Sequence, residues 1–429
     1  MKSRDVPKFG PLQGVNVLLS GNAIAGPAMC GIFAEMGAIV TSLERVDMPD
    51  VLRMAVTEWF SVEHRNQLSI AANIQTPEGK KILAKLLKAN DIFVENNKAG
   101  TMASMGVTDE WIWSHNPKIV IVHVSGFGQS GDPAYTRRAA LDGIAQAFSG
   151  YINNNGLPST PICARPYTAD YVSSLFGAIG ALAALHRAQQ TGVGESIDVA
   201  MYETLLRLSA DGLAYGLNRN IPVTRPGNRT PRAWGEGVYK CKDGKFVFWM
   251  SGNAGKPFMG TLKTVGMQDY DPGPKEDPPF SHNPEYGEEL ERRMKAYCDE
   301  HTAQEVAYTA SRNGATCSKI MEFDDMLSNS HYQARNSITE WYDPCLGETM
   351  KGTRPTPVFK NNPTQIWRGT PILGMDNEDI LEELGYTPEE IEKLYEKKII
   401  RYGSLITKTF KDGQEQLIET KDGKQPLKR

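Results

Sequence analysis

Hydrophobic residues recur along the first part of the chain in short runs of strand length, separated by segments of small and apolar residues. Val15–Ser20 and Ile39–Leu43 have the length and composition of buried strands. Between them, Gly21–Pro27 indicates a turn and Ala28–Met36 a helix, which Gly37 ends. A strand, a helix and a second strand in this order form a βαβ unit with parallel strands. The opening of the chain therefore predicts a parallel sheet.

The same alternation continues to about residue 215. Helices are expected at Thr76–Ala89, Thr108–Asn116, Ala139–Ser149 and Tyr171–Gln190, the last being the longest. Further strands are expected at Asp91–Glu95, at the start of Lys118–Gly131, which ends in a glycine-rich loop, and in Glu195–Leu206, which continues as a helix. This order predicts an α/β fold whose helices cover a mostly parallel sheet.

The composition of the sequence changes after residue 215. Asn218–Trp234 is rich in Arg, Pro, Asn and Gly, as in an extended linker, and 237–250 alternates apolar and polar residues around Asp243-Gly244, a strong hairpin signal. A second, smaller domain is therefore expected in the middle of the chain. Helical caps are predicted near Asp376 and at Thr387. The charged tail from Tyr402 indicates a surface hairpin or a loosely ordered segment.

Composition narrows the class of protein. A chain of 429 residues is too long for one core, so at least two domains, or one discontinuous domain with an insert, are expected. The net charge of −4 argues against a nucleic-acid partner. Six scattered cysteines without a CxxC pair predict reduced thiols and no metal site. The first residues lack an apolar signal region and no long apolar run occurs, so a cytoplasmic protein without a membrane span is expected.

Asp170 stands out because it begins a long run of small and apolar residues. Taken alone, an acid there is typical of a helix N-cap, worth about 1 kcal/mol. An exposed aspartate has a pKa of about 3.9 and is ionised at neutral pH. The loop SGNAIAGP lacks the GxGxxG pattern, so a nicotinamide cofactor is only weakly indicated. His123, within an apolar strand, is expected to be a core histidine with satisfied hydrogen bonds.

Many stretches together resemble a known family in their order along nearly the whole chain. They are PKFGPLQGVNVLLSG, IAGP, FAEMGAIV, HRNQLSI, NPKIVIVHVSGFGQSGDPAY, AFSGY, PYTADYVS, GESIDVAMYE, YKCKDGK, FKNNPTQIWRGTP and GMDNEDIL. The chain resembles the family III CoA-transferases of the CaiB/BaiF type, and within them the L-carnitine and bile-acid CoA-transferases. The resemblance implies a large Rossmann-like domain built from both chain ends, a smaller α+β domain and an interlocked-ring homodimer. The corresponding boundaries are 1–215 for the first part of the large domain, 216–330 for the linker and small domain, and 331–429 for the return linker, the last part of the large domain and the tail.

The resemblance also implies roles for particular residues. Asp170, in PYTADY, matches the family's nucleophilic aspartate, which forms a mixed anhydride and then an aspartyl-CoA thioester during transfer of CoA to a free acid. Lys98, in VENNKAG, matches a lysine that contacts CoA. A family arginine that follows is absent, since Ser104 and Met105 stand there, and Arg65 is a further candidate for the CoA phosphates.

Glycine-rich loops are the candidates for holding CoA or the reaction's oxyanions through backbone N–H groups. Gly126, Gly128 and Gly131 follow one predicted strand. Ser251–Gly255 occupies the place of a mobile family loop but contains fewer glycines, and it is expected to act as a lid. The small residues after Asp170 are expected to let the backbone pack closely around the site. Arg137 and Arg138 are expected to be a basic pair on the surface.

Two rival functions stay open. One is an acyl-CoA racemase of the same fold, which is disfavoured because Leu141 stands where that branch has a histidine that shuttles a proton. The other is a non-catalytic protein that binds CoA or a nucleotide. The acceptor acid is not ranked by the sequence, and a carnitine-like acid, a bile acid and a 2-hydroxy acid are the candidates.

Overall fold

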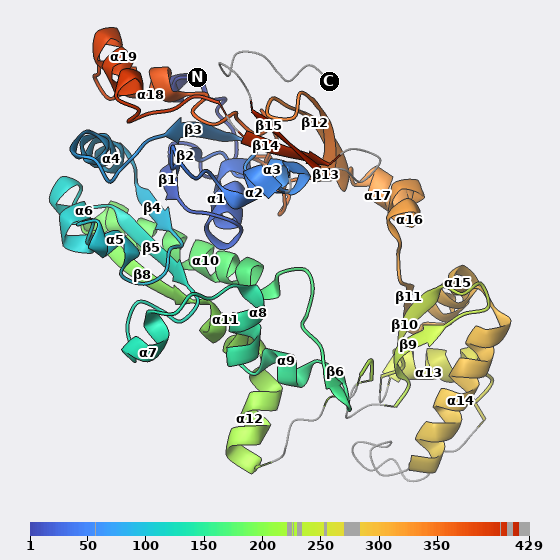
Figure 1. Cartoon of the computed structure of the whole chain (residues 1–429). Coiled ribbons are helices and arrows are strands. Elements are labelled where there is room, and N and C mark those ends of the chain that lie inside the picture. Colours follow the sequence, from blue (N-terminus) through green and yellow to red (C-terminus); the bar gives the residue numbers. More distant parts are fainter. Residues whose placement is uncertain are drawn as a thin grey trace. The chain divides into compact units, whose positions relative to one another are not determined.

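The computed structural model describes residues 1–55, 57–220, 225, 227–229, 234–252, 255–269, 284–403, 405–409 and 415–419. The chain forms two compact units, each assembled from separate segments (Figure 1). Unit 1 consists of Met1–Ser149, Ala164–Leu208 and Gln333–Arg429, and unit 2 of Gly150–Cys163 and Ser209–Tyr332. Unit 2 thus includes the segment Gly150–Cys163, which the predicted boundaries assigned to the large domain.

Unit 1 is built on a six-stranded parallel sheet, which confirms the predicted α/β class. Its strands lie in the order β3-β2-β1-β4-β5-β8. Their bounds are Asn16–Ser20 (β1), Ile39–Glu44 (β2), Gln67–Ala71 (β3), Ile92–Glu95 (β4), Val120–Ser125 (β5) and Glu195–Ala200 (β8). The sequence predicted all of these strands except β3, because Gln67 and Ser69 interrupt its apolar run.

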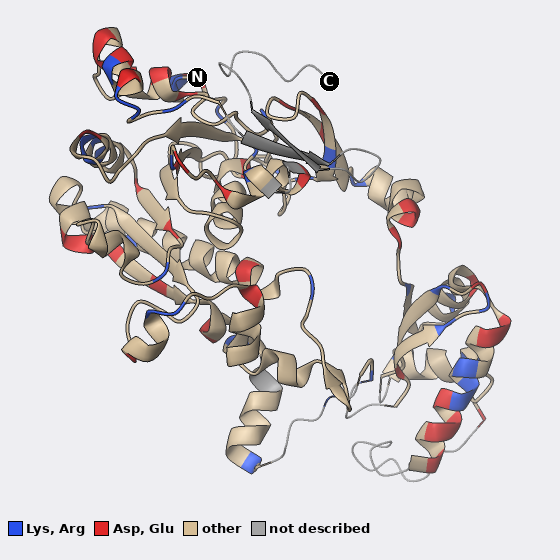
Figure 2. Cartoon of the chain, in the orientation of Figure 1, with Lys and Arg blue, Asp and Glu red and all other residues tan. Residues whose placement is uncertain are grey.

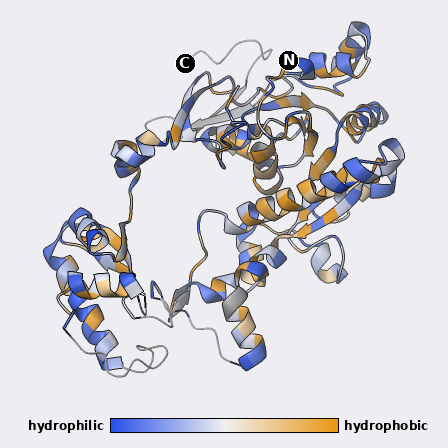
Figure 3. Ribbon diagram, turned by 180° about the vertical axis from the view of Figure 1, so that it is seen from behind, coloured by the Kyte–Doolittle hydropathy of each residue, from blue (hydrophilic) through white to orange (hydrophobic). Residues whose placement is uncertain are grey.

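Helices cover both faces of this sheet, because successive side chains of a buried strand point to opposite sides. On one face lie α1 (Ala25–Glu35) and α10 (Thr168–Thr191), which pack against each other. On the other, α4 (Pro77–Ala89), α6 (Asp109–His115), α18 (Asn377–Glu383) and α19 (Pro388–Glu396) contribute apolar residues to one core with the strands. Figure 3 shows hydrophobic residues gathered on the strands and on the helices against them.

Smaller elements of unit 1 lie at the strand ends and in the returning chain. The helical ones are η1 (Ser3–Asp5), α2 (Val51–Ala55), α3 (Thr57–Glu63), α5 (Thr101–Ser104), α7 (Pro133–Thr136), α8 (Asp142–Phe148) and α11 (Met201–Leu208). Two antiparallel hairpins follow, β12 (Ile338–Asp343) with β13 (Glu348–Thr353), and β14 (Leu405–Thr409) with β15 (Glu415–Glu419). For the tail, the sequence predicted either a surface hairpin or a loosely ordered segment. The hairpin of β14 and β15 agrees with the first of these. The hairpin of β12 and β13 was not expected from the sequence.

Unit 2 has its own core around a three-stranded antiparallel sheet. The hairpin of β9 (Glu236–Lys240) and β10 (Phe246–Met250) is the predicted one, with Gly244 at a φ of 78° in its turn, and β11 (Thr316–Lys319) pairs with β10. Helices α13 (Gly255–Thr264), α14 (Pro284–Glu300) and α15 (Ala303–Arg312) pack on the face that carries Trp249. The remaining elements are α9 (Tyr151–Asn154), β6 (Gly156–Leu157), β7 (Thr160–Pro161), α12 (Ala210–Arg219), α16 (Phe323–Ser328) and, at the boundary, α17 (Ser330–Ala334).

Several element boundaries differ from the predictions for local reasons. Helix α1 begins at Ala25, so the turn before it is shorter than expected, because Pro27 fits the first turn of a helix. Thr387 and Glu390 form the predicted capping box, whereas Asp376 caps α18 without a side-chain bond. The expected linker begins inside α12, and most of its remainder lies outside the described residues.

Helix α10 carries fewer charged side chains than α14, another long helix of the chain. Figure 2 shows α10 almost free of Lys, Arg, Asp and Glu, whereas α14 carries both signs along its length. By length and composition alone α10 could span a membrane, and no other helix among the described residues could. Core helices of soluble proteins pass the same test, and α10 packs against β5, β8 and α1.

Candidate active site

Asp170 lies in the first turn of α10, as its third residue, and its side chain is half-buried. The N-cap is Tyr167, whose backbone has φ 18° and ψ 57° and which makes no side-chain cap bond. The interpretation of Asp170 as an N-cap acid is therefore wrong. Asp170 is instead an acid within the first turn of the helix.

A buried carboxylate on α8 fixes the chain just before Asp170. Asp142 accepts the backbone N–H of Ala169 at 2.7 Å with one oxygen and the Gln146 side-chain amide at 2.6 Å with the other. Gln146 in turn holds the backbone of Ala164 through two hydrogen bonds of 3.0 Å. The segment that leads into α10 is thus tied to α8.

Burial and the charge of Asp142 raise the pKa of Asp170 to about 7. The charged form loses hydration on burial, and a second carboxylate nearby disfavours it further. The expectation of an ordinary, fully ionised acid at neutral pH is therefore wrong. A strongly shifted carboxyl group is a frequent mark of a functional site.

The other neighbour of Asp170 lies in an aromatic, apolar environment. The Tyr171 hydroxyl donates to Glu63 at 2.7 Å and accepts from the Trp59 indole N–H at 3.0 Å, and the Trp59 ring lies 4.6 Å from that of Tyr167. These aromatic side chains pack against a small core of Ile24, Ala28, Leu52 and Phe60. Such surroundings limit the access of water to the head of α10.

Small residues let α1 approach α10 closely, as expected from the sequence. Ser174 donates its hydroxyl to the Ala25 carbonyl at 2.7 Å and also to the Asp170 carbonyl. A Cβ atom at Gly177 would lie 2.3 Å from the end of the Met29 side chain. The head of α10 is therefore anchored to the start of α1, which follows β1.

A cavity of about 150 Å³ opens at the carboxyl ends of four strands. Its walls include Ser20–Asn22 after β1, Glu44 and Arg45 at β2, Asn73–Gln75 after β3, and Asn97 and Thr101 after β4. The strand order reverses between β1 and β4, and ligands of open parallel sheets bind at such a switch point. The lining is polar and of mixed charge, with Arg45 beside the carboxylates of Glu44, Asp47 and Asp50.

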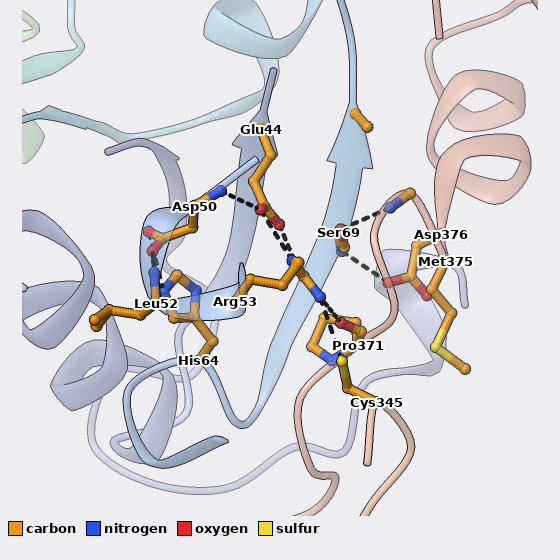
Figure 4. Close-up of polar contacts among 12 residues, drawn as sticks. Glu44, Asp50, Leu52, Arg53, His64, Ser69, Cys345, Pro371, Met375 and Asp376 are labelled. Atoms are coloured by element: carbon orange, nitrogen blue, oxygen red, sulfur yellow. Dashed lines mark hydrogen bonds and ion pairs between the residues drawn. The ribbon is translucent and has the colours of Figure 1, made fainter. Parts of the chain in front are cut away.

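A buried polar network fixes the loop that forms one wall of this cavity (Figure 4). Arg53 makes a two-point ion pair with Glu44, and Glu44 accepts the backbone N–H of Asp50 at 3.1 Å. Asp50 accepts the N–H of Ala23, which has a positive φ of 65°. Burial, together with Glu44, raises the pKa of Asp50 to about 7, and burial lowers that of His64 to about 3.

Of the predicted CoA contacts, Lys98 is exposed on the segment after β4, between Asn97 and Thr101 of the cavity wall. Arg45 also lines the cavity and pairs with Asp47 at 2.6 Å. Arg45 was not predicted from the sequence, although a basic residue directly after the second strand of a βαβ unit was a usable signal. Met105, one of the residues that replace the family arginine, lines the same cavity.

Arg65 has other partners and is only 1% exposed. It forms an ion pair with Glu35, donates to the Thr353 carbonyl at 2.8 Å and stacks over Trp341. It is absent from the residues that line the cavity. The Arg65 guanidinium is thus engaged by protein groups, and a phosphate contact by it has no support in this placement.

The glycine loop after β5 is held by protein groups. The N–H of Gly128 donates to Ser125 at 3.0 Å, and that of Gln129 to Asp198 at 2.8 Å. Gly126 is needed for space, since a Cβ there would lie 2.1 Å from that of Ala140, and Gly131 has a φ of 118°. The geometry explains the glycines without a ligand, and contacts of this loop with CoA stay a prediction.

Other predicted residues have structural partners or remain untested. Both ring nitrogens of His123 are paired, with Glu95 at 2.6 Å and Asp109 at 2.9 Å, which confirms a satisfied core histidine. Despite burial, these two carboxylates raise its pKa to about 9. Arg137 and Arg138 are exposed, as expected. Within Ser251–Gly255, residues 253 and 254 lie outside the described residues, so the lid stays a prediction.

Comparisons with known proteins agree with the fold. The family model for CoA-transferase family III matches residues 12–377. The crystal structure of a CaiB/BaiF family protein from Brucella suis is similar, with a TM-score of 0.75 and 22% identity over 88% of this chain and 100% of that one. A hypothetical protein, Rv3272, from Mycobacterium tuberculosis has a TM-score of 0.74 and 20% identity over 87% and 100% of the two chains. These two likenesses establish the fold.

Proposed function

Because the chain belongs to CoA-transferase family III, we propose that it transfers CoA from an acyl-CoA donor to a free carboxylic acid, with Asp170 as the nucleophile. One observation carries the proposal. Asp170 lies in the first turn of α10, half-buried and with its pKa raised to about 7, between two residues, Ala169 and Tyr171, that are each held by another carboxylate.

The reaction proceeds through covalent intermediates on Asp170. A carboxylate oxygen of Asp170 attacks the donor thioester carbon, CoA leaves as the thiolate, and a mixed anhydride forms. The thiolate then attacks the aspartyl carbonyl carbon, which gives an aspartyl-CoA thioester and releases the donor acid. The acceptor carboxylate attacks this thioester, and the same steps in reverse yield the new acyl-CoA. Each attacking group reacts as an anion, and Asp170, whose pKa is raised to about 7, does so in its ionised fraction.

The surroundings of Asp170 fit this chemistry. A mixed anhydride is lost if water reaches it, and the aromatic wall of Trp59, Tyr167 and Tyr171 shields the head of α10. Asp142 holds the N–H of Ala169, so the carboxylate of the next residue starts from a fixed backbone. An oriented nucleophile lowers the entropic part of the barrier.

The nucleotide end of CoA is assigned in this proposal to the cavity at the carboxyl ends of β1–β4. Arg45 and Lys98 supply positive charge for the phosphates, and polar groups of Asn97 and Thr101 supply hydrogen bonds. Binding energy gained this far from the thioester can be used to orient the reacting groups. From the resemblance we also propose a cytoplasmic homodimer with interlocked rings, and an acceptor that is a carnitine-like, bile or 2-hydroxy acid.

Acyl-CoA racemisation on the same fold is the competing activity. Leu141 precedes Asp142, is 76% exposed, and cannot carry a proton between substrate carbon and solvent. Incubation of a 2-methylacyl-CoA in deuterated water discriminates the two activities. Incorporation of deuterium at the carbon next to the carbonyl would favour the racemase over the transferase.

The direct test is to trap the covalent intermediate. The protein is incubated with a panel of acyl-CoA donors and acids, treated with borohydride, and analysed by peptide mass spectrometry. We expect the reduced residue at Asp170 and loss of CoA exchange in Asp170→Asn. Asp379→Asn is the matched control, because Asp379 is also a half-buried third residue of its helix but pairs with the N-terminus. A label on another residue, or full exchange in Asp170→Asn, contradicts the proposal. Binding of acyl-CoA without any label on the protein would favour simple binding.

A further inference from the structure

The residues on both sides of Asp170 are each held by a buried carboxylate from a different helix. Asp142 of α8 binds the backbone of Ala169, and Glu63, the last residue of α3, binds the side chain of Tyr171. The steps derived above use Asp142 but give Glu63 no task. Glu63 is only 7% exposed, and an acid is rarely placed there without a partner and a reason.

The contacts of Glu63 form a directed chain of hydrogen bonds. The Trp59 indole N–H donates to the Tyr171 hydroxyl at 3.0 Å, and this hydroxyl donates to Glu63 at 2.7 Å. Trp59 and Glu63 are one helical turn apart on α3 and therefore share a face. Two residues of α3 thus bind the side chain of Tyr171 on α10, directly after Asp170.

The end of α3 that carries Glu63 is itself firmly placed. The Glu63 carbonyl accepts the Gln67 side-chain amide at 3.0 Å, and a Cβ at Gly31 of α1 would lie 2.8 Å from that carbonyl oxygen. Burial raises the pKa of Glu63, and the hydrogen bond from Tyr171 opposes this shift. A residue that orients another side chain must itself be held rigidly, and Glu63 meets this requirement.

We propose that Glu63 is a positioning residue, which acts through Tyr171 to hold the first turn of α10 and keep the Asp170 carboxylate in one orientation toward the thioester. This inference rests on the proposed function of Asp170. The role is geometric, so it depends on an acceptor for the Tyr171 hydroxyl and not on a negative charge at residue 63.

The test compares three variants by steady-state exchange kinetics. Tyr171→Phe removes the donor and Glu63→Ala the acceptor, and both are expected to lower kcat by about ten- to a hundredfold, since small displacements of reacting groups have effects of this size. KM for the donor is expected to stay within about twofold, because the cavity that holds the nucleotide is untouched. Glu63→Gln keeps an amide oxygen that accepts the hydroxyl and is expected to retain most of the wild-type rate.

Tyr395→Phe is the matched control, because it removes another partly buried hydroxyl with one hydrogen bond, from Asn377, in the C-terminal part of unit 1. A second readout does not depend on the reaction. In protein labelled with ¹³C at the aspartate carboxyl groups, the Asp170 signal is assigned with Asp170→Asn and titrated without ligand. We expect a lower midpoint in Tyr171→Phe and Glu63→Ala, where a loosened turn admits water, and no change in Glu63→Gln.

An unchanged kcat and an unchanged titration in Tyr171→Phe overturn the inference. So does a Glu63→Gln variant as impaired as Glu63→Ala, because the effect would then belong to the charge. If the wild-type protein forms no thioester on Asp170, the proposed function fails, and the titration alone still decides whether Glu63 and Tyr171 hold this carboxyl group.

Discussion

At the scale of single residues, Asp170 is an acid whose surroundings disfavour its charge. Burial and the nearby Asp142 raise its pKa to about 7. Near neutral pH, a large fraction of the protein molecules therefore carry Asp170 in its protonated form. Only the carboxylate form attacks a thioester. The same environment that shields the intermediate therefore limits how much nucleophile is present.

This shift predicts a pH dependence for the formation of the trapped intermediate. An acid with a raised pKa is protonated below that value, so the trapping rate is expected to fall as the pH drops through about 7 and to level off above it. Asp142→Asn removes the second carboxylate, and the midpoint is expected to move to lower pH. The rate is measured with one donor between about pH 5 and about pH 9.

The control for this prediction is Asp379→Asn, which should have the wild-type profile because Asp379 is remote from α10 in the sequence and pairs with the N-terminus. A profile that stays flat down to about pH 5 would mean that Asp170 is ionised as an ordinary acid is. In that case burial at the head of α10 does not act on the nucleophile as argued above.

The sequence singled out Asp170, the nucleophile in the proposed function, but not its surroundings. Asp170 was visible because an acid at the head of a long apolar helix is unusual and because PYTADY resembles a family pattern. Its pKa was predicted wrongly, since the shift comes from folding, which buries the side chain and brings Asp142 near it. Glu63 gave no signal at all, because its partner Tyr171 lies far along the chain.

At the scale of elements, α10 is the part on which the site depends most. Its glycines face different neighbours. A Cβ at Gly180 would meet Ile197 of β8 at 3.4 Å, an ordinary contact, whereas a Cβ at Gly177 would lie 2.3 Å from Met29 of α1. The two positions therefore separate helix propensity from packing against α1.

Substitution of each glycine by alanine is expected to change stability in opposite directions. Gly180→Ala gains the helix preference of alanine and should raise the free energy of unfolding by about 0.5–1 kcal/mol. Gly177→Ala gains the same preference but forces Met29 to move in a packed core, so a net loss of about 1 kcal/mol is expected. Midpoints of urea unfolding, compared at equal slope, measure both. Equal shifts of the same sign would show that α1 does not press on α10 at Gly177.

Elements were predictable where their signal is local. Apolar runs revealed five strands of the large sheet, and Asp243-Gly244 revealed the hairpin of unit 2, because turn chemistry is written in neighbouring residues. Strand β3 was missed because part of its backbone is hydrogen-bonded by side chains from far along the chain. The N–H of Ser69 donates to Asp376, and that of Ala71 to Asn377. No short window of sequence contains both partners.

At the scale of the whole molecule, each unit has its own core. In unit 1, α18 and α19 contribute Ile380, Leu381, Ile391 and Leu394 to the core that holds the strands, and Asp376 binds the N-terminus and Arg368. The returning end of the chain thus completes the unit that carries Asp170. In unit 2, Trp249, Tyr286 and Met294 are buried in a separate cluster.

Two cores predict that the units lose their structure in distinguishable steps, as multi-domain proteins commonly do. Leu381→Ala removes a fully buried side chain from the core of unit 1, and Met294→Ala does the same in unit 2. Each is expected to destabilise its own unit by about 2–5 kcal/mol, the usual cost of such a cavity. Scanning calorimetry gives the transitions, and hydrogen exchange of peptides from β4 and β5 or from α14 assigns them.

We expect Leu381→Ala to accelerate exchange in β4 and β5 and to leave α14 unchanged, and Met294→Ala to do the reverse. Borohydride trapping at Asp170 should survive heating to the transition of unit 1 and disappear with it, because the described contacts on either side of Asp170 come from α3 and α8 of that unit. One transition that both variants lower equally, with exchange faster in both units, would mean that the cores unfold as one. The orientation of Asp170 would then depend on unit 2 as well as on the contacts described for unit 1.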